Sequence, residues 1–256
     1  MNLLILDRGE VGSLIPADDR RTLHVARVLK KARGEEIAAG ILTDGPFSKA
    51  PGSLGRARIE KLDGEGMILE FQAETEAPAL RPLRLILGFP RPIQGGRLLK
   101  DLASLGVAEI VLCGTELGEK SYLESDLWKK GEYRKAVLEG AEQAGNPRLP
   151  RVRREWSLKA ALASLRAGPV EAGEPDWEAG GSICLHPGEN ALLLGEVSVL
   201  APLSLAIGSE RGWTEAELAR LSAAGFQAAR LGDRILKTET AALAAVSISL
   251  SRLGFM

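Results

Sequence analysis

The feature that most constrains the fold of this chain is an alternation of buried strands and helices that begins at Leu83. Residues 83–88 form a mainly apolar run of the length of a buried strand, and residues 96–105 have the spacing of a helix that ends at Gly106. A second apolar run follows at 109–113. Strand, helix and strand in this order predict a βαβ unit.

The same alternation continues to the carboxyl terminus. Helices are predicted over 126–144, 157–165 and 238–253, and strands over 182–185, 203–207 and 227–230. The capping box Thr214-x-x-Glu217 predicts the start of another helix. The last helix is apolar nearly all round, which predicts that it is buried or lies in an interface. We therefore expect an α/β domain with a mostly parallel sheet.

The first seventy-odd residues have a different pattern, rich in short strands. Strands are predicted over 2–6, 36–42, 56–62 and 67–71, and one helix follows the acidic pair Asp18 and Asp19. A small β barrel fits this pattern. The polar stretch that follows carries two prolines and is typical of a linker. The predicted division is a β-rich domain at 1–74, a linker at 75–82 and an α/β domain at 83–256.

Composition excludes several classes of protein. Lys and Arg number 33 against 34 Asp and Glu, which gives a net charge of −1. No run approaches the roughly 18–20 apolar residues of a membrane span, and the amino terminus lacks the pattern of a signal peptide. Cys113 and Cys184 both lie in apolar runs, which predicts two buried, reduced thiols and no disulfide. These features predict a soluble, cytoplasmic protein without a membrane partner.

Three glycine-bearing loops at predicted strand ends concentrate the candidate site residues. They are 185–188, 207–212 and 231–240. The carboxyl ends of parallel strands are the usual ligand crevice of an open α/β sheet. Glycine there lets the backbone approach a ligand closely, although it is equally common as plain turn chemistry. Neither G-x-G-x-x-G nor a P-loop is present, so the common nucleotide fingerprints are excluded.

The sequence of these loops resembles the carboxyl-terminal signature of the RsmE-type 16S ribosomal RNA uridine-N3 methyltransferase family, which belongs to the SPOUT class. The similarity rests on Ile207-Gly208-Ser209-Glu210-Arg211-Gly212 and on Leu231-Gly232-Asp233-Arg234-Ile235-Leu236-Lys237-Thr238-Glu239. It extends upstream through 139–145, 148–150 and 105–110, and it reaches the first domain at 24–29 and 34–37. Nearly the whole chain is covered in the right order.

The resemblance implies an α/β methyltransferase domain whose chain end threads a deep trefoil knot, and an amino-terminal PUA-like barrel that binds RNA. It implies S-adenosyl-L-methionine as the cofactor and a homodimer with the site near its interface. The cofactor residues that it implies come from the three loops: Leu185, His186, Pro187, Ile207, Gly208, Glu210, Gly212, Leu231, Gly232, Ile235, Leu236 and Thr238.

The chain departs from the family pattern at several positions. Ser209 stands where the family has proline, and Arg211 replaces the first of two glycines. The family's Ser-Glu-Arg after the second strand is Thr115-Glu116-Leu117. The stretches 89–92 and 119–122 resemble a divergent branch of the same family. These changes bear on the choice of substrate more than on the cofactor.

The function that the resemblance implies is methylation of N3 of a uridine in 16S ribosomal RNA of the small ribosomal subunit. N3 carries a proton at neutral pH, so a base, or a cation that stabilises the imide anion, should help. Glu210 and Glu239 are the acid–base candidates, and Arg234 is the electrostatic candidate. The alternatives are a non-catalytic RNA- or ribosome-binding protein on the same fold, and a SPOUT methyltransferase with another RNA target.

A basic cluster of Arg148, Arg151, Arg153 and Arg154 offers two interpretations. It can supply phosphate contacts to RNA, or it can be an ordinary solvated loop. His24 lies on a predicted helix, where it is expected to pack or to face solvent. His186 has no metal partners at ligand spacing, so no metal is expected. Of the four tryptophans, only Trp213 is next to a predicted site loop, where it could stack on a flipped base or pack in the core.

Overall fold

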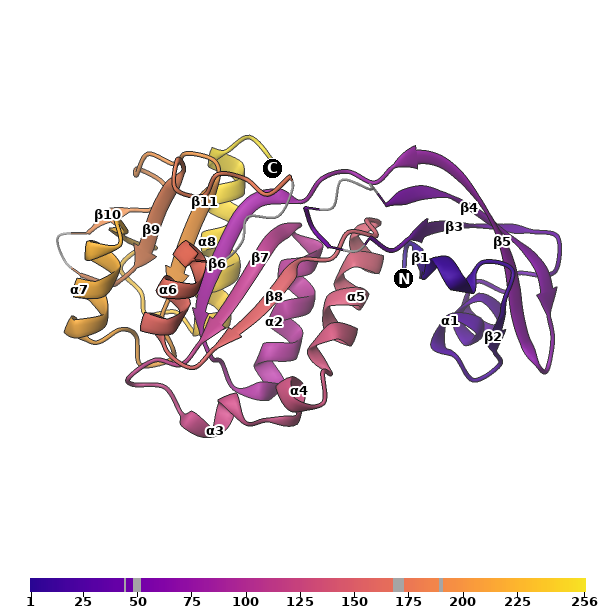
Figure 1. The fold of residues 1–256 in the computed structure, drawn as a ribbon, viewed down its shortest axis with the longest axis horizontal. Coiled ribbons are helices and arrows are strands. Elements are labelled where there is room, and N and C mark those ends of the chain that lie inside the picture. Colours follow the sequence, from indigo (N-terminus) through magenta and orange to yellow (C-terminus); the bar gives the residue numbers. More distant parts are fainter. Residues whose placement is uncertain (44, 48–51, 168–172, 189–190) are drawn as a thin grey trace. The chain divides into compact units, whose positions relative to one another are not determined.

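The computed structural model describes residues 1–43, 45–47, 52–167, 173–188 and 191–256. These residues form two compact units (Figure 1). The first contains Met1–Ala79 together with Ala141–Leu149, and the second contains Leu80–Gly140 and Pro150–Met256. The first unit is therefore assembled from two separate pieces of chain. No helix among the described residues is long and apolar enough to cross a membrane.

The first unit is built on a five-stranded sheet with the order β1-β3-β4-β5-β2. Its strands are β1 (Leu4–Leu6), β2 (Leu14–Pro16), β3 (Glu36–Ile41), β4 (Ser53–Leu62) and β5 (Gly66–Glu76). β1 and β3 pair in parallel, and the other strand pairs of this sheet, as far as the structure describes it, are antiparallel. In the described residues this sheet is open, with β1 and β2 at its edges, so the closed barrel that we expected is not confirmed. Fully buried Leu6, Ile59, Met67 and Leu69 form its core.

The predicted helix after Asp18 and Asp19 is present but short. Asp19 caps it by accepting a hydrogen bond from the backbone N–H of Arg21 at 2.7 Å. The helix α1 (Arg20–Leu23) then widens into a π-helical turn at His24–Val28. The strand β2 was not predicted, because its three residues are too few to establish an alternating pattern.

The segment 141–149 completes the first unit. The backbone N–H of Leu3 donates to the carbonyl of Glu142 at 3.0 Å. The Glu142 carboxylate, 2% exposed, accepts two hydrogen bonds of 2.7 Å from the Arg20 guanidinium. Arg148 donates from Nε to the carbonyl of Ala77 at 3.1 Å. Backbone, charge and side-chain contacts thus join this segment to the amino-terminal strands.

The second unit contains a seven-stranded sheet whose strands, in the described residues, all pair in parallel. Its strand order is β10-β12-β9-β11-β6-β7-β8. The strands are β6 (Arg81–Gly88), β7 (Val107–Cys113), β8 (Arg151–Glu155), β9 (Gly181–Leu185), β10 (Leu192–Leu193), β11 (Leu203–Ile207) and β12 (Gln227–Arg230). The α/β fold with a parallel sheet is confirmed.

Helices cover both faces of this sheet (Figure 1). On one face lie α6 (Leu158–Ala167) and α7 (Glu215–Ala223), and on the other lie α2 (Pro92–Ser104) and α8 (Thr238–Arg252). The remaining helices are α3 (Lys120–Leu123), α4 (Asp126–Lys129) and α5 (Tyr133–Ala144). Cys113 and Cys184 are buried and unpaired, as predicted, and burial raises the pKa of the Cys184 thiol to about 11.

Local sequence signals account for most of these boundaries. The capping box at α7 is formed, since the Glu217 N–H donates to Thr214 Oγ1 at 3.2 Å and the Thr214 N–H donates to Glu217 Oε2 at 3.0 Å. The single helix predicted over 126–144 is wrong. It is divided into α4 and α5 near Gly131, whose φ of +71° is a conformation that favours glycine. Of the predicted linker 75–82, residues 75 and 76 belong to β5, and β6 already begins at Arg81.

Candidate active site at the carboxyl ends of three strands

The three glycine-bearing loops meet because the strands that precede them are neighbours. β12, β9 and β11 are adjacent and parallel, so their carboxyl ends lie at one edge of the sheet. The loops surround a pocket of about 330 Å³. All twelve residues predicted for cofactor binding line it: Leu185, His186, Pro187, Ile207, Gly208, Glu210, Gly212, Leu231, Gly232, Ile235, Leu236 and Thr238. Ser209, Arg211, Arg230, Arg234 and Ala241 complete the described lining.

The loop after β11 is a tight turn that requires glycine for packing reasons. The Gly212 N–H donates to the Ser209 carbonyl at 2.8 Å, and Gly212 has a φ of +76°. A Cβ at Gly208 would stand 2.7 Å from the carbonyl carbon of Gly212. Both glycines are therefore needed to form the turn itself, whatever ligand lies against it.

Gly232 has a different role in the pocket. Its φ is +149°, and a Cβ placed on it would meet no protein atom within 4 Å. The space beside Gly232 is therefore open. A bare backbone next to open space in a lined pocket allows a ligand to approach closely.

The two departures from the family loop leave this pocket accessible. The Ser209 side chain is buried, and its Oγ has no hydrogen-bond partner among the described residues. Arg211 is largely exposed and donates from Nη2 to Glu119 at 3.3 Å. Its guanidinium is therefore held by the loop that follows β7.

The structure brings two of the three predicted catalytic residues to the pocket. Glu210 lines the pocket, and its Oε1 accepts a hydrogen bond from the Arg91 N–H at 3.2 Å. Arg234 also lines the pocket and is exposed. Glu239 lies in the first turn of α8 and is not among the described residues that line it. Of the two acid–base candidates, only Glu210 thus faces the pocket.

The arginine cluster is not a solvated loop, which corrects one of our two interpretations. Arg151, Arg153 and Arg154 belong to the strand β8. Arg151 is 19% exposed and donates from Nε to Glu109 at 2.7 Å, and it also pairs with Glu174. Arg153 lies 3.5 Å from the same Glu109 carboxylate. Two of the three β8 arginines therefore serve mainly to balance buried acids.

These pairs belong to a buried network that the sequence did not reveal. Arg84, in the middle of β6, is 5% exposed and donates from Nε to Glu109, which is fully buried on β7. The indole of Trp177 lies over the Arg84 guanidinium, 4.1 Å from the ring centroid. Burial lowers the pKa of Arg84, while Glu109 and Glu174 oppose that shift. The sequence did not predict this network, because the apolar residues around Arg84 indicate an ordinary buried strand.

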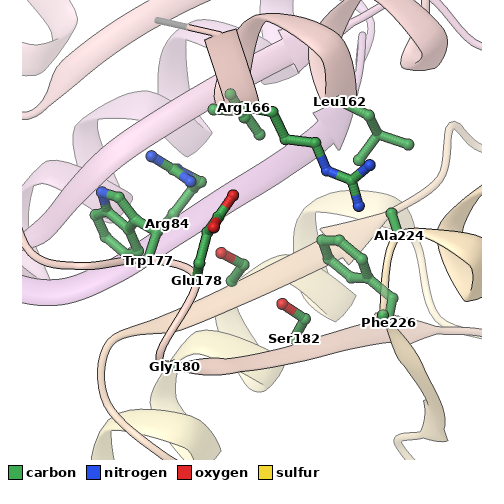
Figure 2. Close-up of a pocket in the computed structure, with 12 residues that line it drawn as sticks. Arg84, Leu162, Arg166, Trp177, Glu178, Gly180, Ser182, Ala224 and Phe226 are labelled. Carbon is green, nitrogen blue, oxygen red and sulfur yellow. The ribbon is translucent and has the colours of Figure 1, made fainter. Parts of the chain in front are cut away.

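A second, larger pocket of about 560 Å³ lies at the opposite ends of the strands. Its floor includes Ser182 and Ser204, the second residues of β9 and β11, so it is at the amino-terminal edge of the sheet. Figure 2 shows Arg166 and Glu178 beside it, above Ser182 and Phe226. Because the two pockets lie at opposite edges, this one does not include the predicted site.

The remaining candidates are also placed by the structure. Trp213 is 6% exposed and packs in the core of the second unit, so it is not available to stack on a base. Trp156, in contrast, is 65% exposed. His186 lines the loop pocket. In the part of the chain that the structure describes, no three His, Cys, Asp or Glu side chains come together as a metal site.

A pocket at the carboxyl ends of parallel strands is typical of α/β proteins that bind a cofactor or substrate. Similarity to known proteins identifies the family. The family model described as RNA methyltransferase domain matches residues 76–250. A relative from Treponema pallidum named ribosomal RNA small subunit methyltransferase E is 37% identical, over 98% of this chain and 91% of its own. The chain therefore belongs to the ribosomal RNA small subunit methyltransferase E family.

Two further similarities cover almost the whole chain. A relative from Borreliella burgdorferi named ribosomal RNA small subunit methyltransferase E 1 is 28% identical, over 99% of both chains. A crystal structure of ribosomal RNA small subunit methyltransferase E from Neisseria gonorrhoeae, bound to S-adenosyl methionine, is 25% identical with a TM-score of 0.69. It covers 98% of this chain and 97% of its own.

Proposed function

We propose that the protein transfers a methyl group from S-adenosyl-L-methionine to N3 of a uridine in 16S ribosomal RNA. The observation that carries the proposal is the convergence of all twelve expected cofactor residues on one pocket. The names of the relatives support the ribosomal RNA substrate, and the cofactor bound to the gonococcal protein supports the methyl donor.

The pocket fits such a cofactor. Its volume of about 330 Å³ is at the lower end of the usual range for small-ligand sites. Leu185, Ile207 and Leu231 supply apolar walls, and Gly232 leaves an open cradle that a side chain would fill. S-adenosyl-L-methionine would supply an activated methyl group on a sulfonium. The chain would hold the adenosine between the loops after β9, β11 and β12.

The residues of the chain would then position the base and move one proton. Glu210 lines the pocket and its carboxylate accepts a hydrogen bond from the Arg91 N–H, and this carboxylate would accept the N3 proton. Arg234 would stabilise the negative charge that develops on the uracil carbonyl oxygens. Ile235, 95% exposed, and Leu236 would cover the reacting atoms and exclude water once a base is bound. Glu239, off the pocket, would act through these residues.

Three finer features belong to the same proposal. The SPOUT resemblance implies a trefoil knot through the site loops and a PUA-like, RNA-binding first unit. It also implies a homodimer. The half-buried side chains of Ala244 and Ile248 on α8 support a dimer, because they leave an apolar stripe that the second unit does not cover completely.

The test is methyl transfer with mapping of the product. The protein would be incubated with S-adenosyl-L-methionine and either small ribosomal subunits or naked 16S RNA, followed by nuclease digestion and mass spectrometry. We expect 3-methyluridine at a single site and a rate that falls at least tenfold in Glu210→Gln. Methylation of another atom or another RNA would overturn the substrate assignment, and binding of RNA without any transfer would favour a non-catalytic role.

A further inference from the structure

Trp156 stands out because large aromatic side chains are usually buried in a folded protein. It is 65% exposed, whereas Trp128 and Trp213 are each 6% exposed. The guanidinium of Arg154 lies over its ring, 5.4 Å from the centroid. Arg154 is itself exposed, and its hydrogen bond to the Leu123 carbonyl is long at 3.4 Å. An indole and a cation are thus presented together to solvent.

The backbone that carries Trp156 is fixed. The Gly114 N–H donates to the Glu155 carbonyl at 3.1 Å, and the Leu158 N–H donates to the Gly114 carbonyl at 2.9 Å. A Cβ at Gly114 would stand 2.3 Å from the carbonyl oxygen of Trp156, so the segments after β7 and β8 are in backbone contact. The exposed indole is therefore held by a rigid junction between the ends of β7 and β8.

The position of this junction relates Trp156 to the candidate active site. Trp156 follows β8, whose carboxyl end lies at the same edge of the parallel sheet as those of β9 and β11. Three strand spacings, about 14 Å, separate β8 from β11. The loop after β7 spans this interval. One end contacts Trp156 through Gly114, and at the other end a Cβ on Gly118 would be 3.7 Å from Cβ of Ser209 in the pocket.

Single-stranded RNA is the partner that such a pair fits. Proteins that hold single strands stack bases on aromatic rings and meet phosphates with arginine. The pair is one loop away from the pocket, a distance that a few nucleotides span. Tryptophan and arginine are also enriched at protein interfaces, so it is the position of the pair, one loop away from the pocket, that favours RNA.

We propose that Trp156 and Arg154 form a stacking pair that holds a nucleotide near the target uridine, in the single strand that leads to the active site. Trp156 stacks on the base and Arg154 meets the adjoining phosphate. This inference rests on the proposed function, since it takes the pocket to be the site of RNA methylation. It assigns to Trp156 a role in binding RNA and none in holding the cofactor.

The experiment compares variants for RNA and cofactor affinity separately. The intact protein would be titrated with 16S RNA and with a short single-stranded uridine oligonucleotide, and in parallel with S-adenosyl-L-methionine by calorimetry. Trp156→Ala should weaken RNA binding at least fivefold, the lower end of the effect of removing one base stack. Trp156→Tyr should keep most of the affinity. Leu200→Ala, which changes a residue 57% exposed just before β11, is the matched control and should change nothing.

Salt dependence separates the two members of the pair. Arg154→Gln should flatten the slope of log affinity against log salt concentration by about one, because one phosphate contact is lost. Trp156→Ala should leave that slope unchanged. RNA affinity of Trp156→Ala within twofold of the wild type would overturn the inference. A loss of RNA and cofactor affinity shared by Trp156→Tyr would also overturn it, since it would indicate a structural role.

The outcomes also distinguish this inference from the proposed function. If the wild type binds RNA through Trp156 but transfers no methyl group, the proposed function fails and the stacking pair stands. If the wild type methylates 16S RNA and Trp156→Ala does so with an unchanged KM, the stacking pair fails and the proposed function stands.

Discussion

Arg151 donates a hydrogen bond of 2.7 Å from Nε to the carboxylate of Glu109, whose side chain is completely buried in the parallel sheet. The same carboxylate accepts from Arg84 of the neighbouring strand on its other side. An acid without solvent contact is stable only when cations and donors surround it. Arg151 is therefore an internal counter-ion, although its sequence context resembles an RNA-binding cluster.

The first prediction concerns the stability of this network. Arg151→Gln should lower the free energy of unfolding by about 1.5–3 kcal/mol, because the buried Glu109 loses one charged hydrogen-bond donor while Arg84 and Arg153 still face it. Arg154→Gln, on the same strand but exposed, should stay within about 0.5 kcal/mol of the wild type. Urea unfolding of the three proteins measures the difference. Equal losses for both variants would show that the network does not hold the sheet together.

The second prediction concerns the cofactor pocket. Leu236→Trp should fill the pocket and abolish binding of S-adenosyl-L-methionine in calorimetry while the thermal midpoint stays near that of the wild type. Gly232→Val should also abolish binding, but its φ of +149° makes any side chain there strained, so the loop is expected to shift as well. Leu200→Trp, at the other edge of the sheet, is the control. If folded Leu236→Trp bound S-adenosyl-L-methionine with unchanged affinity, the cofactor site would have to be elsewhere in the protein.

The third prediction concerns the homodimer. Val246 and Leu250 are among the most apolar residues of the last helix, but they are 0% and 1% exposed within the single chain. Aspartate at either position should unfold the protein whatever its oligomeric state. Ile248→Asp, at a half-buried position, should instead give folded monomers.

Light scattering at tens of micromolar protein checks the oligomer. We expect the mass of two chains for the wild type and of one chain for Ile248→Asp, with little methyl transfer in the monomer. A monomeric wild type that transfers methyl groups normally would contradict a site that depends on two subunits.

The fourth prediction concerns acid stability of the first unit. Hydrogen bonds from the Arg21 guanidinium lower the pKa of Glu10 below its ordinary 4.5. Burial alone would raise the pKa of Asp19, but hydrogen bonds from the Arg21 side chain and N–H lower it below 3.8. Carboxyl groups with a lowered pKa in the folded state stabilise it above their ordinary pKa, and this contribution is lost as pH falls through the lowered values.

Arg21→Gln should therefore be less stable than the wild type at pH 7, and the difference should shrink once the pH falls below about 4. Chemical unfolding at a series of pH values measures this convergence. Arg58→Gln, which removes a largely exposed pair with Glu60, should change stability little at any pH. A difference between Arg21→Gln and the wild type that is constant from pH 7 to pH 3 would contradict the electrostatic origin.

The sequence predicted elements whose signals are local. The structure confirms the strands at 203–207 and 227–230 and the capping box at Thr214. These were predictable because their hydrophobic and capping patterns lie in consecutive residues. The strand β8 was missed, since its arginines indicate surface charge, and the buried Glu109 that Arg151 and Arg153 contact lies on another strand. A helix break at Gly131 was missed because one glycine within a helical pattern is often tolerated.

The candidate site was predicted unevenly. The physical pattern gave only three loops at strand ends, and the family resemblance supplied the twelve individual residues that line the pocket. Neither gave Trp156, which followed no motif. Exposure depends on what the rest of the chain leaves uncovered, and that requires the three-dimensional structure.

The first unit is formed by two separate segments of the chain, and this limits how the protein can be divided. Residues 141–149 belong to the first unit, and Glu142 is held there by Arg20 and by the Leu3 N–H. A fragment that stops near residue 79 would leave the Arg20 guanidinium without its buried acid, and a fragment that starts near residue 80 would carry the buried acid without its arginine. Neither unit of such a chain can therefore be exchanged as one continuous stretch of sequence, because the first unit needs residues that lie inside the second unit's part of the chain.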